Sequence, residues 1–417
     1  MITVYPELGS STTTAVNVKL PSTSSDAFGR LRISEPFTLF DSSHRYADNG
    51  LWVESITGTA SSSFSANEGV VNLSVGTVNG NQIIRETVRV FAYQPGKSLL
   101  NMNTFVMGAA KTNLRQRVGY FGNDNGFYLE REGSNVYLVE RSVVTSSVVN
   151  TRVAQADWNQ DKLDGTGPSK ITLDLSKAQI LYSDMEWLGL GTVRMGFVID
   201  GVFVPAHNFH HANLVTTTYI TTASLPLRYE MTNIGTTASS STLKQVCSTV
   251  ISEGGYELRG LQQAIGTPIT TSRSTLASGA FLPVVSLRLK SARLDAIVIL
   301  TAISIMGGGN SNNYNWQVQS NPTTTGGSWV SAGSNSSVEY NITGTGLTTS
   351  GRVLASGYFS SSNQSTSSVN ILKESLFSFQ LERNYFTSTP YELALVVAGG
   401  GSGQPVYGSM DWEEISR

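Results

Sequence analysis

Charged residues are scarce in this sequence. Asp, Glu, Lys and Arg make up 14% of it, well below the roughly 25% of an average soluble domain. Acidic and basic side chains nearly cancel, at 30 and 28 respectively. Because a net charge of −2 gives no long-range attraction to polyanions, we expect no nucleic-acid partner.

Cysteine and long apolar runs are also lacking. Cys247 is the only cysteine, which excludes an intrachain disulfide framework. It stands in the alternating segment LKQVCSTVIS, where we expect a small buried side chain. No stretch approaches the roughly 20 apolar residues of a membrane span, and the N-terminus has no basic start or apolar core of a secretory signal. We therefore expect a chain made in the cytoplasm that neither inserts in a membrane nor needs oxidation to fold.

Strand patterns dominate what is present. Segments such as VVNLSV (70–75), VYLVERSVV (136–144) and TVRMGFVID (192–200) are rich in β-branched and aromatic residues and are bounded by turn residues. Asp200-Gly201 predicts a hairpin turn between two apolar runs. Apolar runs recur about every 10–15 residues, a spacing that favours an all-β chain of jelly-roll-like β-sandwiches.

One stretch interrupts the strand rhythm. Residues 253–279 are rich in Gly, Ser and Thr, which predicts a junction between two domains. We divide the sequence into an extended N-terminal docking arm (1–45), a first β-sandwich (46–255), a linker (256–280) and a second, outward-facing β-sandwich (281–417).

The arm mixes aromatic and cationic residues. Residues 1–25 are rich in Ser and Thr and have no periodic apolar face with which to build a core. Aromatic side chains anchor interfaces, and arginine pairs with acids or carbonyl groups. We therefore predict docking on a neighbouring subunit or another partner through Phe28, Arg30, Arg32, Phe37 and Phe40. The alternative is that the arm folds back on its own sandwich as an edge strand.

A cluster of histidines raises the question of a metal ion. HNFHH contains His207, His210 and His211, and three converging ligands would suit zinc. In an extended segment, however, His210 points away from the other two, and no carboxylate lies at metalloprotease spacing. A polar loop or a contact between chains is the favoured interpretation, and a metal ion stays an alternative.

A second segment resembles part of a calcium loop. Asp157, Asn159 and Asp161 occupy alternate positions in DWNQDKLDGTG, but Lys162 and Pro168 stand where such a loop needs Gly and Glu. An Asx-turn loop is the favoured interpretation, and a calcium site of another kind stays open. No cofactor and no metal ligand are predicted.

One pair of acids could support catalysis. Asp184 and Glu186 alternate beside Trp187 and would lie on one face of a strand, and glycoside hydrolysis uses two carboxyl groups. No further acid, serine-hydrolase elbow or phosphate-binding loop accompanies them. The sequence therefore predicts no catalytic residue, and a protein that is not an enzyme.

Several separated motifs, in order along the chain, resemble a known family. They are SDAFGRLRISEPFTLFDSSHRYADN, LRQRVGYFGNDNGFYLE, WNQDKLDGTG, MEWLGLGTVRMGFVIDG, LPLRYEMTN and LKQVCSTVISEGG. Together, over about residues 25–260, they are similar to virion structural proteins of tailed bacteriophages. The strands around VRMGFVIDG also look like those of concanavalin-type jelly-roll sandwiches. The resemblance implies membership of a virion, with other tail, baseplate or capsid proteins as partners, and does not extend to residues 280–417.

These observations predict a non-enzymatic bacteriophage structural protein, either a fibre-like tail or baseplate component or a capsid decoration subunit. We expect a homo-oligomer, with a trimer as one form, although no heptad stretch enforces it. The alternative is a lectin-like adsorption protein whose second domain binds host polysaccharide through Tyr314, Trp316 and Trp329. A depolymerase that uses Asp184 and Glu186 is the third and least favoured hypothesis.

Overall fold

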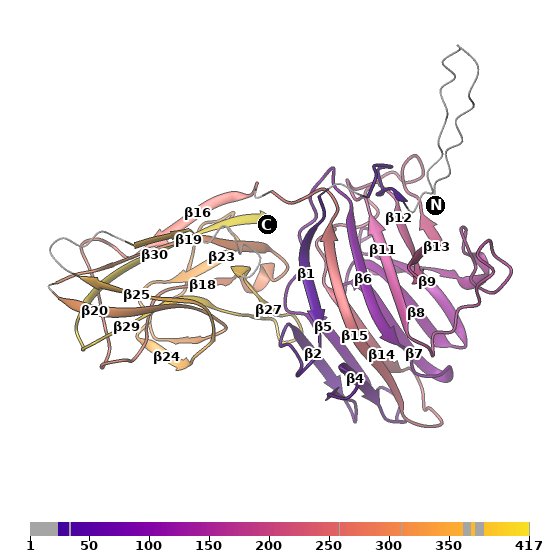
Figure 1. Ribbon diagram of the computed structural model, residues 1–417, viewed down its shortest axis with the longest axis horizontal. Coiled ribbons are helices and arrows are strands. Elements are labelled where there is room, and N and C mark those ends of the chain that lie inside the picture. Colours follow the sequence, from indigo (N-terminus) through magenta and orange to yellow (C-terminus); the bar gives the residue numbers. More distant parts are fainter. Residues whose placement is uncertain are drawn as a thin grey trace, which may run out of the picture.

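Two β-sandwiches form the chain in this computed structural model, and they lie beside one another (Figure 1). The structure describes residues 24–32, 35–257, 259–309, 311–361, 368–371 and 379–416. Its complete helical elements within these ranges are two single turns of 3-10 helix, Gln155–Asp157 and Ser291–Arg293. The predicted all-β fold of tandem sandwiches is confirmed.

The first sandwich packs an eight-stranded sheet on a seven-stranded one, and all strand pairs are antiparallel. The eight-stranded sheet consists, in spatial order, of β13 (Val202–Phe209), β12 (Val193–Ile199), β11 (Gln179–Met185), β6 (Leu99–Val106), β15 (Ser241–Ser252), β4 (Val70–Val75) and β3 (Ser61–Ser65), with β1 (Phe37–Ser43) also paired to β15. The seven-stranded sheet consists of β10 (Val149–Ala154), β9 (Asn135–Ser142), β8 (Gly126–Gly133), β7 (Lys111–Phe121), β14 (Leu227–Asn233), β5 (Gln82–Thr87) and β2 (Trp52–Thr57).

The second sandwich is smaller. One sheet consists of β16 (Leu261–Gly266), β30 (Pro405–Ser416), β19 (Ile297–Gly307) and β26 (Ser368–Ile371), with β17 (Arg273–Ser274) paired to β30. The other consists of β22 (Val330–Ser331), β23 (Val338–Asn341), β18 (Leu282–Leu289), β29 (Leu393–Gly399), β20 (Asn312–Ser320) and β25 (Arg352–Ser361). Two short hairpins pair β21 (Thr323–Thr325) with β24 (Gly346–Thr349) and β27 (Arg383–Asn384) with β28 (Thr389–Pro390).

Local sequence explains many of these strands. VVNLSV forms β4 over the same residues as the predicted run, and Val71, Leu73 and Val75 are buried in the core between the sheets. The hairpin between β12 and β13 turns at Asp200 and Gly201, which both have positive φ, as a two-residue turn of this kind requires. By contrast, residues 88–93 and 216–226 are also rich in apolar or β-branched side chains but form no strand; they connect β5 to β6 and β13 to β14.

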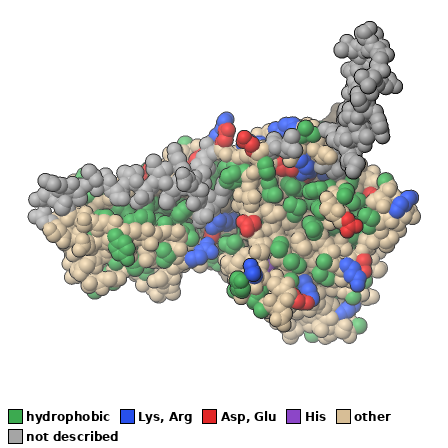
Figure 2. All heavy atoms as spheres, viewed as in Figure 1, with side chains coloured by type: hydrophobic (Ala, Val, Ile, Leu, Met, Phe, Trp, Pro, Cys, Tyr) green, Lys and Arg blue, Asp and Glu red, His purple; other side chains and the backbone are tan. Residues whose placement is uncertain are grey.

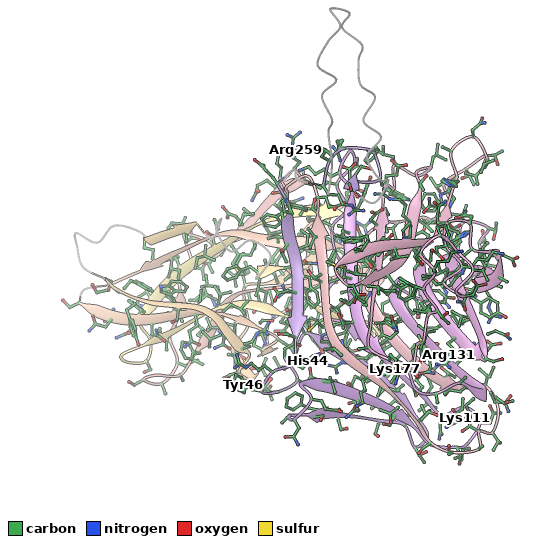
Figure 3. All side chains as sticks on the ribbon, turned by 45° about the vertical axis from the view of Figure 1, so that its right-hand side comes forward. His44, Tyr46, Lys111, Arg131, Lys177 and Arg259 are labelled. Carbon is green, nitrogen blue, oxygen red and sulfur yellow. The ribbon has the colours of Figure 1, made fainter. Side chains whose placement is uncertain are left out.

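The predicted domain boundaries need two corrections. β16 and β17 lie inside the predicted linker 256–280, and both pair with β30, so the second sandwich begins at Leu261. The connection is therefore much shorter than predicted. Figure 3 shows its residue Arg259 near one end of β1, while His44 and Tyr46 lie near the other end.

The second correction concerns the arm, because part of it belongs to the first sandwich. β1 pairs with β15 from Phe37↔Ser252 to Ser43↔Cys247. Its apolar residues Leu39 and Phe40 enter the core, which satisfies an edge that would otherwise be open. The alternative interpretation, an arm folded back on its own sandwich, is therefore the one observed for residues 37–43. Residues 1–23 of the predicted arm lie outside the described residues.

Cys247 also differs from its prediction. It lies where the pairing of β15 with β6 shifts register between Gln245 and Ser248, and its side chain is exposed rather than buried. An irregularity in register breaks the alternation of inward and outward side chains, so the alternating sequence around Cys247 predicts the wrong side.

No helix among the described residues has the length and apolar character needed to span a membrane.

Candidate functional site

Two of the five predicted docking residues are held inside their own domain. Phe40 is 7% exposed, and its ring packs against Phe91 at 4.9 Å and Trp52 at 6.0 Å. Arg32 forms ion pairs with Asp184 and Glu253. Their prediction as partner contacts is wrong, because a ring buried in the core and a guanidinium held by two carboxylates of the same domain are not available to another chain.

The other three docking residues lie nearer the surface. Arg30 pairs with Asp26, with 2.6 Å between Nε and Oδ2. Phe28 and Phe37 are 37% and 38% exposed, and Leu31 nearby in the sequence is 44% exposed. The ring of Phe37 also lies 6.0 Å from that of Tyr256. Phe28, Leu31 and Phe37, here called the exposed apolar group, thus keep part of their surface exposed.

The proposed glycan contacts of the second domain are mostly core residues. Tyr314 is 2% exposed, stacks on Phe359 at 4.7 Å, and donates its hydroxyl to the carbonyl oxygen of Pro405 at 2.8 Å. Trp316 is 7% exposed. Both predictions are wrong, since a buried ring cannot stack on a sugar. Trp329 is half-buried, with the guanidinium of Arg288 4.1 Å from its ring centre.

The three clustered histidines face different partners. The Nδ1 atom of His207 accepts a hydrogen bond from the Asn159 amide at 3.2 Å, and burial lowers the pKa of His207 to about 4. His210 is exposed, with Nδ1 3.2 Å from the Thr192 hydroxyl. His211 is buried against Glu140 and the carbonyl group of Gly191. The three rings therefore do not converge on one point.

The segment that resembles a calcium loop is closed by its own hydrogen bonds. Asp161 is buried, and its two carboxylate oxygens accept the amides of Leu163 at 2.8 Å and Ser169 at 2.7 Å. These bonds are those of an Asx-type loop. Across the described ranges, no group of three or more His, Cys, Asp or Glu side chains is placed to hold a metal ion.

The acid pair formed by Asp184 on β11 and Glu186 just after it is engaged as well. Arg194 binds Asp184 through two nitrogens, at 2.7 and 2.8 Å, while Arg32 contacts the same carboxylate. Glu186 accepts the Thr192 amide at 3.0 Å. Asp184 therefore fastens the N-terminal segment to the outer face of the sheet, and the two acids act as separate structural groups.

One hollow lies where the two sandwiches meet. It has a volume of about 1070 Å³ and receives residues from both domains. The first sandwich contributes the aromatic rings of Tyr93 and Trp187, which lie 5.9 Å apart in an edge-to-face arrangement, and the segment 221–224. The second contributes residues 291–296 and the neighbouring rings of Tyr385 and Phe386. We call this hollow the cleft.

A short segment of the second sandwich is hydrogen-bonded to the first sandwich close to the cleft. Residues 380–383, here called the clasp, lie alongside residues 87–90 of the first sandwich. Gln380 donates to the carbonyl of Val90 at 2.9 Å, and the amide of Arg383 donates to that of Val88 at 2.9 Å. Beside them, an apolar group of Val90, Ala92, Ile297 and Ile299 is buried across the junction.

Arg383 is the charged centre of the clasp. Its side chain is 1% exposed and contacts Glu86 of the first sandwich at 2.7 Å and Asp295 of the second at 2.9 Å. It also donates to the Thr87 carbonyl at 2.7 Å. Because Asp295 lines the cleft as well, the clasp and the cleft share a wall. A buried guanidinium with this many acceptors fixes the orientation of the two domains.

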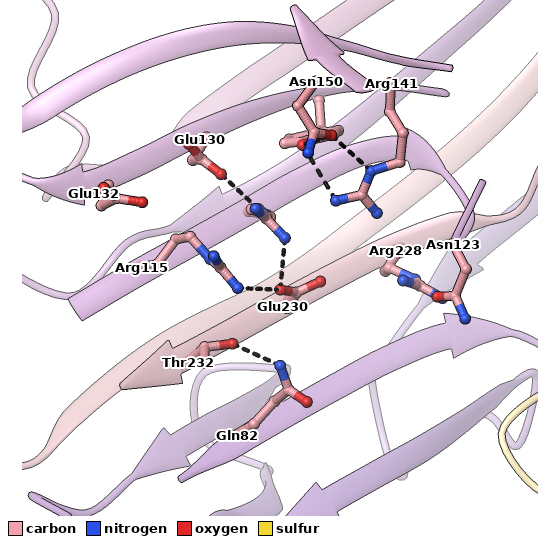
Figure 4. Close-up of polar contacts among 12 residues, drawn as sticks. Gln82, Arg115, Asn123, Glu130, Glu132, Arg141, Asn150, Arg228, Glu230 and Thr232 are labelled. Carbon is pink, nitrogen blue, oxygen red and sulfur yellow. Dashed lines mark hydrogen bonds and ion pairs between the residues drawn. The ribbon is translucent and has the colours of Figure 1, made fainter. Parts of the chain in front are cut away.

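The outer face of the seven-stranded sheet carries a network of side-chain ion pairs, part of which is drawn in Figure 4, and it lies next to the cleft. Arg117 on β7 donates to Glu130 on β8 at 2.6 Å and to Glu230 on β14 at 3.0 Å. Arg115 lies 3.5 Å from Glu230, and Arg228 pairs with Glu86 at 2.6 Å. We call this surface the charged face.

The charged face brings two carboxyl groups, those of Glu130 and Glu230, onto one guanidinium. Burial alone would raise the pKa of Glu230, but the surrounding arginines, above all Arg117 and Arg228, hold it below its ordinary value. A general acid of glycoside hydrolysis needs the opposite shift. This pair is therefore arranged for ion pairing rather than for proton transfer.

Comparison with known proteins supports the β-sandwich fold and assigns no family. No protein-family model and no curated protein matches the sequence. Similar solved structures include a protein of unknown function from Shewanella oneidensis (13% identity, 59% of this chain and 100% of that one, TM-score 0.35). Another is the Emp47p carbohydrate recognition domain (10% identity, 52% and 97%, TM-score 0.34). The botulinum neurotoxin serotype G binding domain is matched over 47% of its length. These likenesses concern the β-sandwich fold alone.

The same comparison corrects one prediction. A glycosyl hydrolase family 16 protein from Mycobacterium smegmatis matches with 9% identity over 51% of this chain and 100% of that one, at a TM-score of 0.34. A β-1,3-glucanase from Mycobacterium marinum is similar too. This finding corrects the prediction that the chain is not an enzyme, because glycosyl hydrolases share the β-sandwich fold, and a β-sandwich without a recognised motif therefore does not exclude catalysis.

The cleft itself was missed by the sequence interpretation. Trp187 was noted only as a neighbour of two acids, and Tyr93, Asn123, Asp295 and Tyr385 were not singled out. These residues are separated by up to about three hundred positions, and none belongs to a short motif. The available signal was an aromatic residue in each of two Gly-, Ser- or Thr-rich connections, too common a pattern to identify a site.

Proposed function

We propose that this protein binds carbohydrate and that the cleft between the sandwiches is the binding site. The observation that carries the proposal is the composition of the cleft wall, where four aromatic rings stand among hydroxyl and amide side chains from both domains. Binding sites for small ligands typically combine such rings with a few polar groups that orient the ligand. The volume of about 1070 Å³ exceeds what a single sugar ring would fill, which favours an oligosaccharide.

The chemistry of the wall favours a sugar over other small molecules. One face of a sugar ring presents C–H groups that stack on an aromatic ring, and its hydroxyl groups exchange hydrogen bonds with Ser, Thr and Asn side chains. Ser55, Asn123 and Thr222 provide such partners. Arg293 and Asp295 are the lining residues of the cleft with opposite charges, and they cancel. A neutral saccharide therefore fits better than a strongly acidic one.

A glycan array tests the proposal, followed by calorimetric titration of each positive saccharide. Replacing Trp187 with Ala removes a stacking ring, and we expect affinity to fall at least tenfold, as for a central aromatic contact. Trp329→Ala is the matched control, because Trp329 lies on the second sandwich outside the cleft. Binding that survives Trp187→Ala and disappears in Trp329→Ala would contradict the cleft as the site.

A second function is compatible with the first: the chain as a subunit of a bacteriophage particle. It is supported by the motifs over residues 25–260 that resemble virion structural proteins, and by the exposed apolar group of Phe28, Leu31 and Phe37. In this proposal the group contacts a tail, baseplate or capsid protein or a second copy of the chain, as a trimer or another homo-oligomer. The protein is then located in the virion.

Incorporation into particles tests this second function. We expect a variant with Phe28→Ser and Phe37→Ser to fold like the wild type and to be lost from purified particles, because both rings are already partly exposed in the free chain. Sedimentation of the isolated protein would show whether the same variant alters self-association. Normal incorporation of the double variant would contradict a docking role for this group.

A further inference from the structure

His211 is the one member of the histidine cluster with charged and polar partners on both sides of its ring. The side chain is 5% exposed. Its Nε2 atom lies 2.6 Å from a carboxylate oxygen of Glu140 on β9, and Nδ1 lies 2.5 Å from the Gly191 carbonyl oxygen. The ring stacks on Tyr219, with 3.7 Å between ring centres and 9° between planes.

These contacts join the two loops that form the first-sandwich wall of the cleft. Gly191 ends the loop that carries Trp187, and the Gly191 amide is bonded to the Trp187 carbonyl at 2.8 Å. Tyr219 donates its amide to Gly189 at 3.1 Å and its hydroxyl to the Glu186 carbonyl at 3.2 Å. Residues 221–224, which line the cleft, follow directly. His211 thus lies behind the wall rather than in the cleft.

The protonation of His211 decides whether both contacts exist. A carbonyl and a carboxylate oxygen are acceptors only, so the ring can satisfy both when both of its nitrogens carry a proton. A neutral ring turns a lone pair toward one of the two oxygens, and that contact becomes repulsive. Buried hydrogen bonds to charged groups are among the stronger ones, so their loss would loosen the link between the loops.

Several other titratable groups surround His211. Burial, together with Glu140, Tyr93 and Glu186, raises the pKa of Tyr219, so its phenol stays neutral. Burial also raises the pKa of Tyr93. The remaining groups that face His211 are the carboxylates of Glu140 on β9 and Glu186 after β11, and on its own segment His207, neutral above its lowered pKa of about 4, and the exposed His210.

We infer that His211 is the positioning residue of the cleft, and that its doubly protonated ring holds the Trp187 loop and the 211–219 loop in the binding arrangement. The inference rests on the proposed function for the role of the cleft, but not for the movement of Trp187. Saccharide binding should accordingly weaken as the pH rises and the ring loses its proton.

The movement is measured on the free protein labelled with 5-fluorotryptophan. The fluorine signal of Trp187 is assigned by its absence in Trp187→Phe and is followed from about pH 5 to 8, where histidines usually titrate. We expect the wild-type signal to shift with pH and the shift to vanish in His211→Phe, which keeps the stack on Tyr219. Glu140→Gln, which keeps the volume and can donate to a neutral ring, should also reduce the shift. His210→Gln is the control and should shift as the wild type does.

Binding provides the second readout. For a saccharide found by the array, we expect affinity to fall about tenfold between pH 5 and 8 in the wild type and less than twofold in His211→Phe. A Trp187 signal that moves equally in wild type and His211→Phe would overturn the role of His211. If the signal behaves as expected but no saccharide binds at any pH, the positioning role stands and the proposed ligand class fails.

Discussion

The two sandwiches share a fold and differ in the polar side chains that cover their sheets. In the first, the outer face of the seven-stranded sheet is covered by long ionised side chains such as Arg117, Glu130 and Glu230, which lie flat against one another and are almost fully buried. In the second, the buried polar residues of the sheet around β29 are uncharged and most are small, among them Ser286, Ser320 and Asn341. On the face seen in Figure 2, blue and red side chains gather over the first sandwich and the junction.

This difference shows that a sheet can be shielded from water in two ways. Ion pairs between neighbouring strands hide backbone under a layer of charge, whose stability depends on pH and on every partner being present. Small hydroxyl and amide groups give a surface that is insensitive to pH. In the second sandwich, burial raises the pKa of both Glu392 and Asp411, and at Glu392 it outweighs the opposing effects of Thr324 and Arg288.

The largest expected effect comes from separating the stabilities of the two domains. Phe40→Ala removes a buried ring at the edge of the first core, and we expect a loss of about 3–5 kcal/mol in the free energy of unfolding of that domain. Scanning calorimetry should show the first-sandwich transition moving to lower temperature while that of the second sandwich stays near its wild-type value. Equal shifts of both transitions would show that the sandwiches unfold as one unit.

A smaller effect is expected from the clasp. Arg383→Met removes the guanidinium that joins Glu86 to Asp295, but Glu86 keeps its partner Arg228. We expect a loss of about 2–3 kcal/mol, below the cost of a buried charge left without any partner. Limited proteolysis should then cut the connection near Arg259 faster. Arg288→Gln is the matched control, since its pair with Glu339 is more exposed and should contribute less than about 1 kcal/mol.

The pH dependence should differ in sign between the domains. The lowered pKa of Glu230 means that its contribution to stability is present above the ordinary glutamate pKa and is lost as the pH falls through the lower, folded value. The raised pKa values of Glu392 and Asp411 act in the opposite direction, with stability lost as the pH rises through them. Acidification from about pH 5 to 3 should therefore lower the melting temperature of the first sandwich more than that of the second. In Glu230→Gln, the melting temperature of the first sandwich should depend less on pH. Melting temperatures of the two sandwiches that fall equally with pH in the unmodified protein would contradict this assignment.

The smallest effect belongs to the exposed apolar group. Phe28→Ala should change the free energy of unfolding by no more than about 0.5 kcal/mol, because the ring is already 37% exposed. Chemical denaturation of this variant beside Phe40→Ala would separate a surface aromatic residue from a core one in the same short segment. A loss above about 2 kcal/mol for Phe28→Ala would show that the N-terminal segment carries more of the fold than its exposure indicates.

Sequence patterns predicted the fold class and many strands, because alternation of apolar and polar residues reports directly on a half-buried sheet. These patterns failed where pairing between strands far apart in the sequence decides which side chains are buried. Phe40 was read as a docking residue, since the sequence does not show that its strand pairs with β15 some two hundred residues later. Tyr314 and Trp316 were assigned to the surface on the strength of a Ser- and Asn-rich neighbourhood, yet both alternate inward on β20. The cleft could not be predicted at all, because it is formed by the way in which two separate sandwiches meet.

The pairing of β1 with β15 has a consequence for synthesis of the chain. Phe37 leaves the ribosome early, but its partner Ser252 is made only at the far end of the same domain. At a translation rate of roughly 5–20 residues per second, β1 waits for ten seconds or more with its apolar side uncovered. During that interval, a protein that binds nascent chains has access to Leu39 and Phe40. A chain whose synthesis stops before β15 would lack the strand with which β1 pairs.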